Sequence, residues 1–186
     1  TLCATLRAFE RAVHLLSAVD HQTGCVLSQC RVDDKTNEHK AALDLLREMV
    51  LKGRVIVGDA MFCQRDLCQQ VIDCEGDYLI AVKENQPGLL REIQLEFHSD
   101  PAGGSPYGLR EHAADRQTAS TLDKGHGRLE RRTLTSTTAL TGDLDWPGVK
   151  QVCRIERERT IGDKKTVEVV YYVTSLPRSK ANAATL

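Results

Sequence analysis

One carboxylate in this 186-residue sequence follows a pattern that commonly places a ligand at a sheet edge. Asp59 comes directly after the β-branched run Val55-Ile56-Val57 and Gly58, which predicts a strand buried on both faces. Ligands of open α/β sheets gather outside the carboxyl ends of the strands, and magnesium prefers hard oxygen ligands. Asp59 is therefore a candidate metal ligand at the rim of a mostly parallel sheet. The alternative is the commoner role of an Asp at a strand end, a helix cap or a turn.

Three further polar residues follow the next predicted strand, residues 78–82. Lys83, Asn85 and Gln86 are expected on the same edge as Asp59, because the two strands should form a parallel βαβ unit. They are candidates for contacting a phosphate or a sugar of a nucleic acid. The alternative is a hydrogen-bonded loop that shapes the turn before Pro87.

A third group of candidates is basic and lies late in the chain. Arg128, Arg131 and Arg132 form a local cluster that is a candidate for binding DNA phosphates, with a solvated strand face as the alternative. Glu130 lies among them and invites an interpretation as a catalytic acid. We favour the simpler interpretation, in which Glu130 is a strand residue paired with Arg128 or Arg132.

Charge is distributed unevenly although the net charge is only −1. Residues 1–100 hold 11 Lys and Arg against 16 Asp and Glu, whereas residues 101–186 hold 14 against 10. An acidic half suits metal ions and a basic half suits phosphates. Charge alone favours an ordinary solvated surface, so the candidate sites depend on the motifs.

The elements that must position these residues follow from periodicity. An antiparallel hairpin is predicted over residues 13–32, with a turn at Gly24, followed by a helix over 38–52 that Gly53 ends. Helices are also predicted over residues 65–75 and from Pro87 onward. Residues 99–127 are predicted to form a loop, and residues 129–137, 149–160 and 166–174 to form strands.

Composition limits the other classes. No apolar run approaches the roughly 20 residues of a membrane helix, and no signal-peptide pattern is seen, so we expect a cytoplasmic protein. The seven cysteines contain no Cys-x-x-Cys pair and are expected to be reduced, mostly packed thiols. A nucleotide-binding α/β domain ranks last, because no glycine-rich phosphate loop follows either early strand.

Several motifs occur together in an order that resembles one known family. The sequence is similar to the H-repeat-associated group of DDE-type insertion-sequence transposases. The resemblance covers nearly the whole chain and is carried by residues 32–38, the stretch around Gly58-Asp59-Ala60, Gly76-Asp77-Tyr78, Lys83-Glu84-Asn85-Gln86, residues 126–132 and residues 171–176.

The resemblance implies an α/β fold with a ribonuclease-H-like mixed sheet, flanking helices and a β-rich insertion. It implies two Asp and one Glu that hold Mg²⁺ or Mn²⁺ for DNA cleavage and strand transfer, with Asp59 as the second Asp. DNA at insertion-sequence ends and targets would be the partner, in association with the bacterial nucleoid, and the full-length parent would be a homodimer.

The first Asp and the final Glu of this triad have no counterpart in the sequence. The chain is therefore expected to be an internal fragment, truncated at both ends and inactive by itself. The alternative is a catalytically dead remnant that binds only DNA or a full-length transposase. The expected parts are a partial catalytic core (1–98), a loop or insertion boundary (99–127), a β-rich insertion (128–176) and the start of the truncated catalytic helix (177–186).

Overall fold

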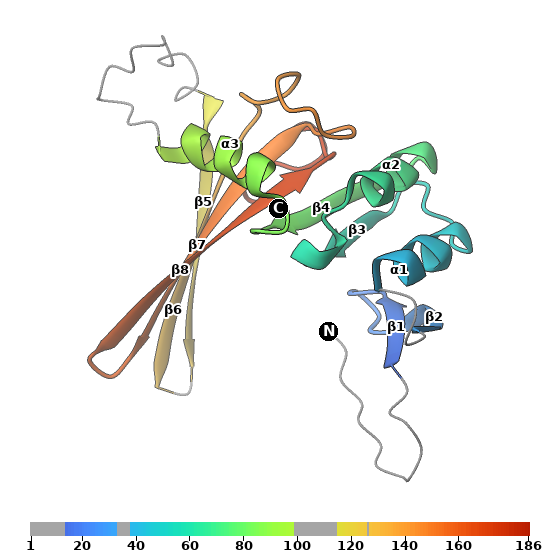
Figure 1. Cartoon of the computed structure of the whole chain (residues 1–186). Coiled ribbons are helices and arrows are strands. Elements are labelled where there is room, and N and C mark those ends of the chain that lie inside the picture. Colours follow the sequence, from blue (N-terminus) through green and yellow to red (C-terminus); the bar gives the residue numbers. More distant parts are fainter. Residues whose placement is uncertain (1–13, 33–37, 99–114, 126) are drawn as a thin grey trace.

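The computed structural model describes residues 14–32, 38–98, 115–125 and 127–186, which form a mixed α/β structure. Within them, β1 and β2 pair as a two-stranded sheet, and the other strands form a six-stranded sheet in the order β3-β4-β8-β7-β6-β5 (Figure 1). The elements are β1 (His14–Val19), β2 (Val26–Val32), α1 (Glu38–Arg47), β3 (Val55–Gly58), the short 3₁₀ helix η1 (Ala60–Phe62), α2 (Arg65–Asp73), β4 (Asp77–Val82), α3 (Pro87–His98), β5 (Gln117–Gly125), β6 (Arg128–Thr137), β7 (Gln151–Ile161) and β8 (Lys164–Thr174).

The pairing of β3 with β4 confirms the predicted parallel βαβ unit, with Gly58 opposite Ile80. The expectation of a mostly parallel sheet was wrong. The strand β8 comes back from a hairpin with β7 and pairs antiparallel with β4, with Ile80 opposite Val173. Every pairing from β4 to β5 in the described sheet is therefore antiparallel.

The strand β3 was predicted to be buried on both faces, and this was also wrong. Val55 is 44% exposed and Val57 is 55% exposed, whereas Ile56 packs against the core. Side chains alternate between the two faces of a strand, so the described residues cover only the Ile56 side of β3. A continuous β-branched run therefore does not by itself establish burial on both faces.

The first helix is shorter than its sequence pattern suggested. The helix α1 ends at Arg47 rather than Lys52, and Leu51, which lies beyond its end, is buried. Gly53 has a φ of +72° and donates its N–H to the carbonyl oxygen of Glu75 at 3.1 Å. It therefore turns the chain into β3 instead of ending the helix.

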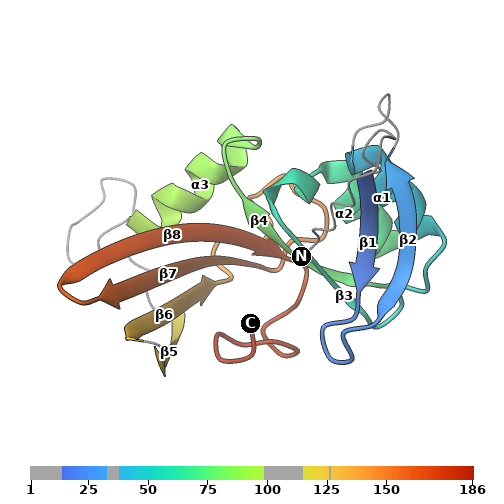
Figure 2. The same ribbon diagram turned by 90° about the horizontal axis from the view of Figure 1, so that it is seen from below.

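The hairpin prediction at the start of the described chain is confirmed. The strands β1 and β2 pair antiparallel around a turn in which Gly24 has a φ of +70°. Figure 2 shows this hairpin beside α1, which contacts both strands.

The late part of the chain forms a long β ribbon, of which one strand was missed. The strands β6, β7 and β8 correspond to the predicted ones, but β5 lies inside the region predicted as a loop. Most β5 side chains are exposed and polar, so no apolar alternation marks the strand, while its backbone pairs with β6 from Gln117 to Gly125. Residues 177–186 form turns, and the start of a helix expected there stays a prediction. The free end of the ribbon extends away from the helices (Figure 1).

The core lies where α2 and α3 pack with β4, β8 and the loop that precedes β7. Tyr78 is fully buried, and its hydroxyl donates to the carbonyl oxygen of Pro147 at 2.6 Å. Trp146 and Val149 from that loop are buried in the same cluster. This packing fixes the position of β4, and β4 pairs with β3, whose last residue Gly58 directly precedes Asp59.

Buried cysteines contribute to this core as thiols. Cys63, Cys68 and Cys153 are fully buried, and burial raises the pKa of each thiol to about 12. No disulfide joins the cysteines that the structure describes. Cys25 and Cys74 are exposed, so the expected packing of the cysteines into the core holds for some of them and not for others.

Among the helices described, none has the length and apolar character needed to cross a membrane.

Candidate metal and nucleic-acid sites

Asp59 lies at the carboxyl end of β3, where the chain turns into η1. Its backbone is extended, and its Oδ1 accepts a hydrogen bond from the Met61 N–H at 3.1 Å. Asp59 therefore caps η1, which is the role that the sequence analysis gave as the alternative. The side chain is exposed, and Oδ2 makes no hydrogen bond or ion pair with any other described residue. One carboxylate oxygen fixes the turn while the other remains available to a ligand.

Gly58 allows η1 to fold back closely onto the end of β3. A Cβ atom at this position would lie 3.3 Å from the Cβ of Phe62. This distance is closer than ordinary van der Waals contact, so a larger residue would displace η1. The glycine before Asp59 therefore contributes to the direction in which the carboxylate points.

Asn85 and Gln86 bind the segment that follows Asp59. The Asn85 Nδ2 donates to the carbonyl oxygen of Ala60 at 2.6 Å, and the Gln86 Nε2 donates to that of Cys63 at 2.9 Å. These bonds correspond to the predicted alternative, a hydrogen-bonded loop, and they commit the amide N–H groups to the protein. Contact of either residue with DNA remains a prediction.

Lys83 differs from its two neighbours. Its side chain is exposed, and it forms no ion pair with another residue in the described ranges. Lys83 follows β4 as Asp59 follows β3, and the two strands are parallel, so both residues lie at the same edge of the sheet. A lysine here adds a mobile positive charge near the candidate metal ligand.

The basic cluster predicted in β6 is divided between the two faces of the ribbon. Side chains alternate along a strand, so Arg128, Glu130 and Arg132 share one face while Arg131 lies on the other. Arg131 is instead opposite Glu158 of β7. The prediction that the three arginines form one cluster was therefore wrong for Arg131.

Two arginines that the sequence analysis missed complete the cluster. Arg159 and Arg157 of β7 lie opposite Glu130 and Arg132, on the same face. The Arg157 Nε donates to Glu130 Oε1 at 2.8 Å, and the Arg159 Nε donates to Oε2 at 3.3 Å. The pairing of two different strands creates this cluster, so the local sequence around Glu130 does not reveal these two arginines.

Glu130 is the anion at the centre of the cluster. Its side chain is 2% exposed and also pairs with Arg132 Nη2 at 2.6 Å and with Arg128 Nε at 3.7 Å. Hydrogen bonds from Arg157 above all, together with those from Arg132 and Arg159, lower the pKa of Glu130 to about 2, against the opposing effect of desolvation. The favoured prediction for Glu130, a strand residue paired with Arg128 or Arg132, agrees with this geometry.

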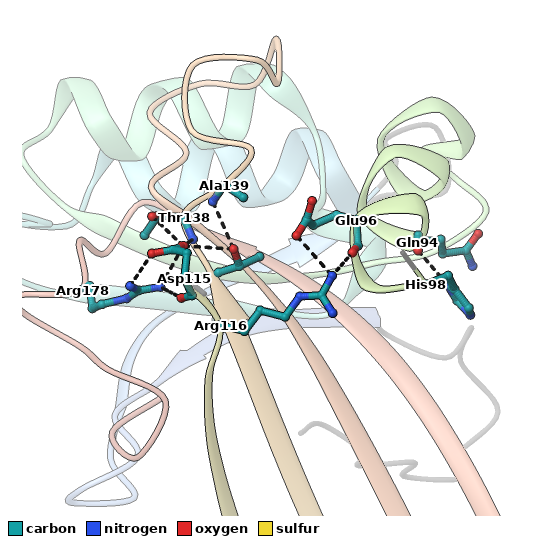
Figure 3. A network of polar contacts seen from close by, with 9 residues as sticks. Gln94, Glu96, His98, Asp115, Arg116, Thr138, Ala139 and Arg178 are labelled. Carbon is teal, nitrogen blue, oxygen red and sulfur yellow. Dashed lines mark hydrogen bonds and ion pairs between the residues drawn. The ribbon is translucent and has the colours of Figure 1, made fainter. Parts of the chain in front are cut away.

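A separate polar cluster fixes the base of the ribbon (Figure 3). Asp115 Oδ2 accepts hydrogen bonds from the Thr137 hydroxyl and the Thr138 N–H, and Asp115 Oδ1 pairs with Arg178 Nη1 at 2.6 Å. Burial raises the pKa of Asp115, but these hydrogen bonds outweigh it and hold the pKa well below its usual range. Both oxygens of Asp115 are occupied by protein donors, so this cluster is structural.

Comparison with known proteins identifies the family. Residues 5–173 match the family described as the transposase DDE domain, so the chain belongs to this family. It is 30% identical over 184 residues to the "H repeat-associated putative transposase YhhI" of Escherichia coli K12, covering 94% of this chain and 46% of that protein.

Two other relatives match a similar share of the chain. The chain is 32% identical over 171 residues to the "Putative transposase YncI" of Escherichia coli O157:H7, covering 88% of this chain and 42% of the relative. It is 34% identical over 168 residues to a protein in the dhlA 3′ region of Xanthobacter autotrophicus, covering 89% and 54%. The chain thus spans about half the length of the curated relatives that it matches.

Proposed function

We propose that this chain contributes to the catalytic domain of an insertion-sequence transposase that cuts DNA phosphodiester bonds at the element ends and joins the freed 3′-hydroxyl to target DNA. Membership of the DDE transposase family supports DNA as the substrate. The observation that carries the catalytic part of the proposal is the position of Asp59. It lies at the carboxyl end of a strand in a parallel pair, with one carboxylate oxygen free of partners among the described residues.

The residues present fit part of a site for Mg²⁺ or Mn²⁺. Asp59 supplies a hard, exposed oxygen ligand, the type that Mg²⁺ prefers. Among the described residues, no group of three or more His, Cys, Asp or Glu side chains could hold a metal ion. Asp59 would therefore share the metal with ligands outside these residues. A bound divalent ion would activate the attacking oxygen and stabilise the leaving oxygen in phosphoryl transfer.

The protein groups around Asp59 have their own part in this proposal. The N–H of Met61 holds Oδ1, and Oδ2 has no hydrogen-bonding partner among the described residues. Lys83 provides positive charge at the same edge, where it would attract a phosphate of the strand to be cut. Asn85 and Gln86 keep the turn after Asp59 in place.

The proposed fold is ribonuclease-H-like, with residues 1–98 as part of the catalytic core and residues 128–176 as a β insertion. The parallel β3–β4 pair flanked by helices supports the first assignment, and the protruding antiparallel ribbon supports the second. In this proposal residues 99–127 mark the insertion boundary, although β5 already belongs to the ribbon. Homodimerisation on paired DNA ends completes the proposal.

The test restores the flanking coding sequence and measures Mg²⁺-dependent cleavage of a duplex that carries the element end. We expect Asp59→Asn to abolish cleavage. The control is Asp143→Asn, which removes an exposed carboxylate far along the chain that makes no hydrogen bond with a described residue. Unchanged cleavage by the Asp59 variant would exclude Asp59 as a metal ligand.

A binding measurement on the present chain separates metal binding from catalysis. A ligand that binds only the folded state raises its stability, by about 2.7 kcal/mol at a concentration 100 times the Kd. We expect Mg²⁺ or Mn²⁺ to raise the melting temperature of the original chain more than that of Asp59→Asn. Salt-sensitive DNA binding without metal-linked stabilisation would instead support a chain that binds DNA but does not cut it.

A further inference from the structure

The face of the ribbon that carries Glu130 has an unusual concentration of guanidinium groups. Arg128 and Arg132 of β6 and Arg157 and Arg159 of β7 surround this one carboxylate. Arg132 and Arg157 are direct cross-strand neighbours, a placement of like charges that costs free energy unless an anion compensates it. We call these four residues the arginine cluster.

The cluster keeps hydrogen-bonding capacity that faces the solvent. Glu130 binds the Nε atoms of all four arginines, whose side chains are between 36% and 51% exposed. Within the described part of the chain, the terminal Nη groups of Arg128 and Arg159 have no hydrogen-bonding partner. Glu130 therefore orients these arginines through their inner nitrogen atoms and leaves outer donors available.

Other acidic residues that the structure describes on this part of the face lie to the sides of the cluster. Asp123 of β5 is opposite Glu130, and Glu168 of β8 reaches Arg157 Nη1 at 4.0 Å, the outer limit of an ion pair. The positive charge is thus concentrated along the middle strands β6 and β7. A ligand with regularly spaced anionic groups would follow this line.

The opposite face of the ribbon shows a different arrangement. There Arg154 pairs with Glu156, and Lys165 pairs with Glu158, beside Arg131. Cations on that face are therefore mostly matched by individual carboxylates. This face also exposes the apolar side chains of Leu122, Leu129 and Val167, which have no group that binds an anion.

At the free end of the ribbon, an open hollow of about 530 Å³ is lined by Lys124, Leu129 and Thr160, which lie on the face opposite Glu130, together with Arg128 and the glycines at 125, 127 and 162. Arg128 belongs to both this hollow and the arginine cluster, but the hollow opens on the other face and does not continue the cluster.

We propose that the arginine cluster binds the sugar–phosphate backbone of duplex DNA, with Glu130 as the residue that holds the guanidinium groups in place. Arginine donors match phosphate oxygens in a planar, bidentate geometry. Such contacts position a duplex without reading its sequence. The proposal does not depend on metal binding at Asp59. Compared with the cluster predicted from the sequence, the proposed DNA-binding surface includes Arg157 and Arg159 and excludes Arg131.

The test compares two charge-matched double variants of this chain. Fluorescence anisotropy measures binding to a labelled duplex of arbitrary sequence, about three helical turns long, across a range of salt concentrations. Each phosphate contact contributes about 0.9 to the slope of log K against log salt concentration. For Arg157→Gln/Arg159→Gln we therefore expect the slope to fall by about 2 and the affinity to fall about 10-fold or more.

The control is Arg131→Gln/Arg154→Gln, which removes the same charge from the opposite face of the same two strands. We expect it to retain the original slope and affinity. Equal losses for the two double variants would overturn the proposal, because they would indicate a response to net charge alone. No loss in the Arg157 and Arg159 variant would overturn it as well.

A measurement on the unaltered chain avoids any effect of the substitutions on folding. Phenylglyoxal modifies accessible guanidinium groups, and mass spectrometry locates the modified residues. We expect duplex DNA to protect the four residues of the arginine cluster while Arg131 and Arg154 stay reactive. Protection of Arg131 and Arg154 instead would place the DNA on the opposite face. Because Asp59→Asn leaves this surface intact, loss of cleavage with retained binding separates a failure of one proposal from a failure of the other.

Discussion

The side-chain amide of Asn85 donates to the carbonyl oxygen of Ala60 across a distance of 2.6 Å and a separation of 25 residues in sequence. This bond connects the segment after β4 to the segment after β3. It places a rigid support directly next to Asp59, whose own side chain caps η1. Asn85, one of the candidates for a phosphate contact in the sequence analysis, therefore stabilises the turn that carries the candidate metal ligand.

Replacement of Asn85 tests this support. We expect Asn85→Ala to lower the free energy of unfolding by about 1 kcal/mol, because one partly buried hydrogen bond is lost. Urea denaturation gives the measurement. The control Lys83→Ala removes an exposed side chain two residues earlier and should change stability by less than about 0.5 kcal/mol. Equal effects of the two variants would contradict a supporting role for Asn85.

Gln151 connects the end of the chain to the sheet. It is 1% exposed, and its Nε2 donates to the carbonyl oxygens of Leu176 and Ala181 at 2.8 and 2.9 Å. We expect Gln151→Leu to lower the free energy of unfolding by about 2–4 kcal/mol, because both buried carbonyl groups lose this donor. Thermal or urea unfolding measures the change.

The matched control for Gln151 is Gln69→Leu. Gln69 is exposed on α2, and its amide donates only to Asp73 at 2.8 Å in the described structure. Its replacement should change stability by less than about 0.5 kcal/mol. A cost for Gln151→Leu as small as that for Gln69→Leu would show that residues 177–186 are not anchored through this side chain.

The fold could be predicted wherever local pattern and tertiary packing agree. The parallel β3–β4 unit followed from an apolar run, an amphipathic helix and a second apolar run. The strand β5 could not be predicted, because an exposed, polar strand depends on backbone pairing with β6. The exposure of Val57 could not be predicted either, since propensity for a strand does not show what covers its faces.

The candidate sites also divide into features that the local sequence predicts and features that depend on tertiary structure. Asp59 was recognised from its position after a strand, which depends only on local sequence. The alternation of side chains along β6 is also a local property, and it is sufficient to separate Arg131 from Arg128 and Arg132. The hydrogen bond between Arg157 and Glu130 depends on the register between β6 and β7, which brings together residues 27 positions apart in sequence. No local pattern contains that information.

Gly148 offers a test of packing between the loop before β7 and α2. It has a φ of +62°, and an added Cβ would lie 3.0 Å from two carbon atoms of Ile72. We expect Gly148→Ala to cost about 1–3 kcal/mol from this overpacking, besides the strain of a left-handed backbone. The measurement is the midpoint of urea unfolding.

Gly24→Ala isolates the contribution of the Ile72 contact. Gly24 has a similar φ of +70°, but nothing lies within 4 Å of its added Cβ. Its variant should therefore show backbone strain alone and lose less stability than Gly148→Ala. If the two variants lose equal stability, the loop before β7 does not pack tightly against α2.

The depressed pKa of Glu130 predicts how acid affects the ribbon. In the unfolded chain a Glu titrates near its ordinary pKa of about 4.3, whereas in the folded protein the surrounding arginines lower the pKa of Glu130 to about 2. The folded state therefore holds this proton less tightly than the unfolded state. The contribution of Glu130 to stability is fully present above about pH 4.5 and is lost as the pH falls toward about 2.

Comparison with Glu130→Gln makes this prediction specific to one group. The variant cannot ionise at this position, so its stability deficit relative to the original chain should be constant from about pH 7 to about pH 5. The deficit should then shrink progressively below about pH 4.5, because the original chain alone loses the ionised Glu130. Urea unfolding at each pH gives both curves. A deficit that stays constant down to about pH 2.5 would mean that Glu130 has the same pKa in both states, and the arginine cluster would then not be organised around its charge.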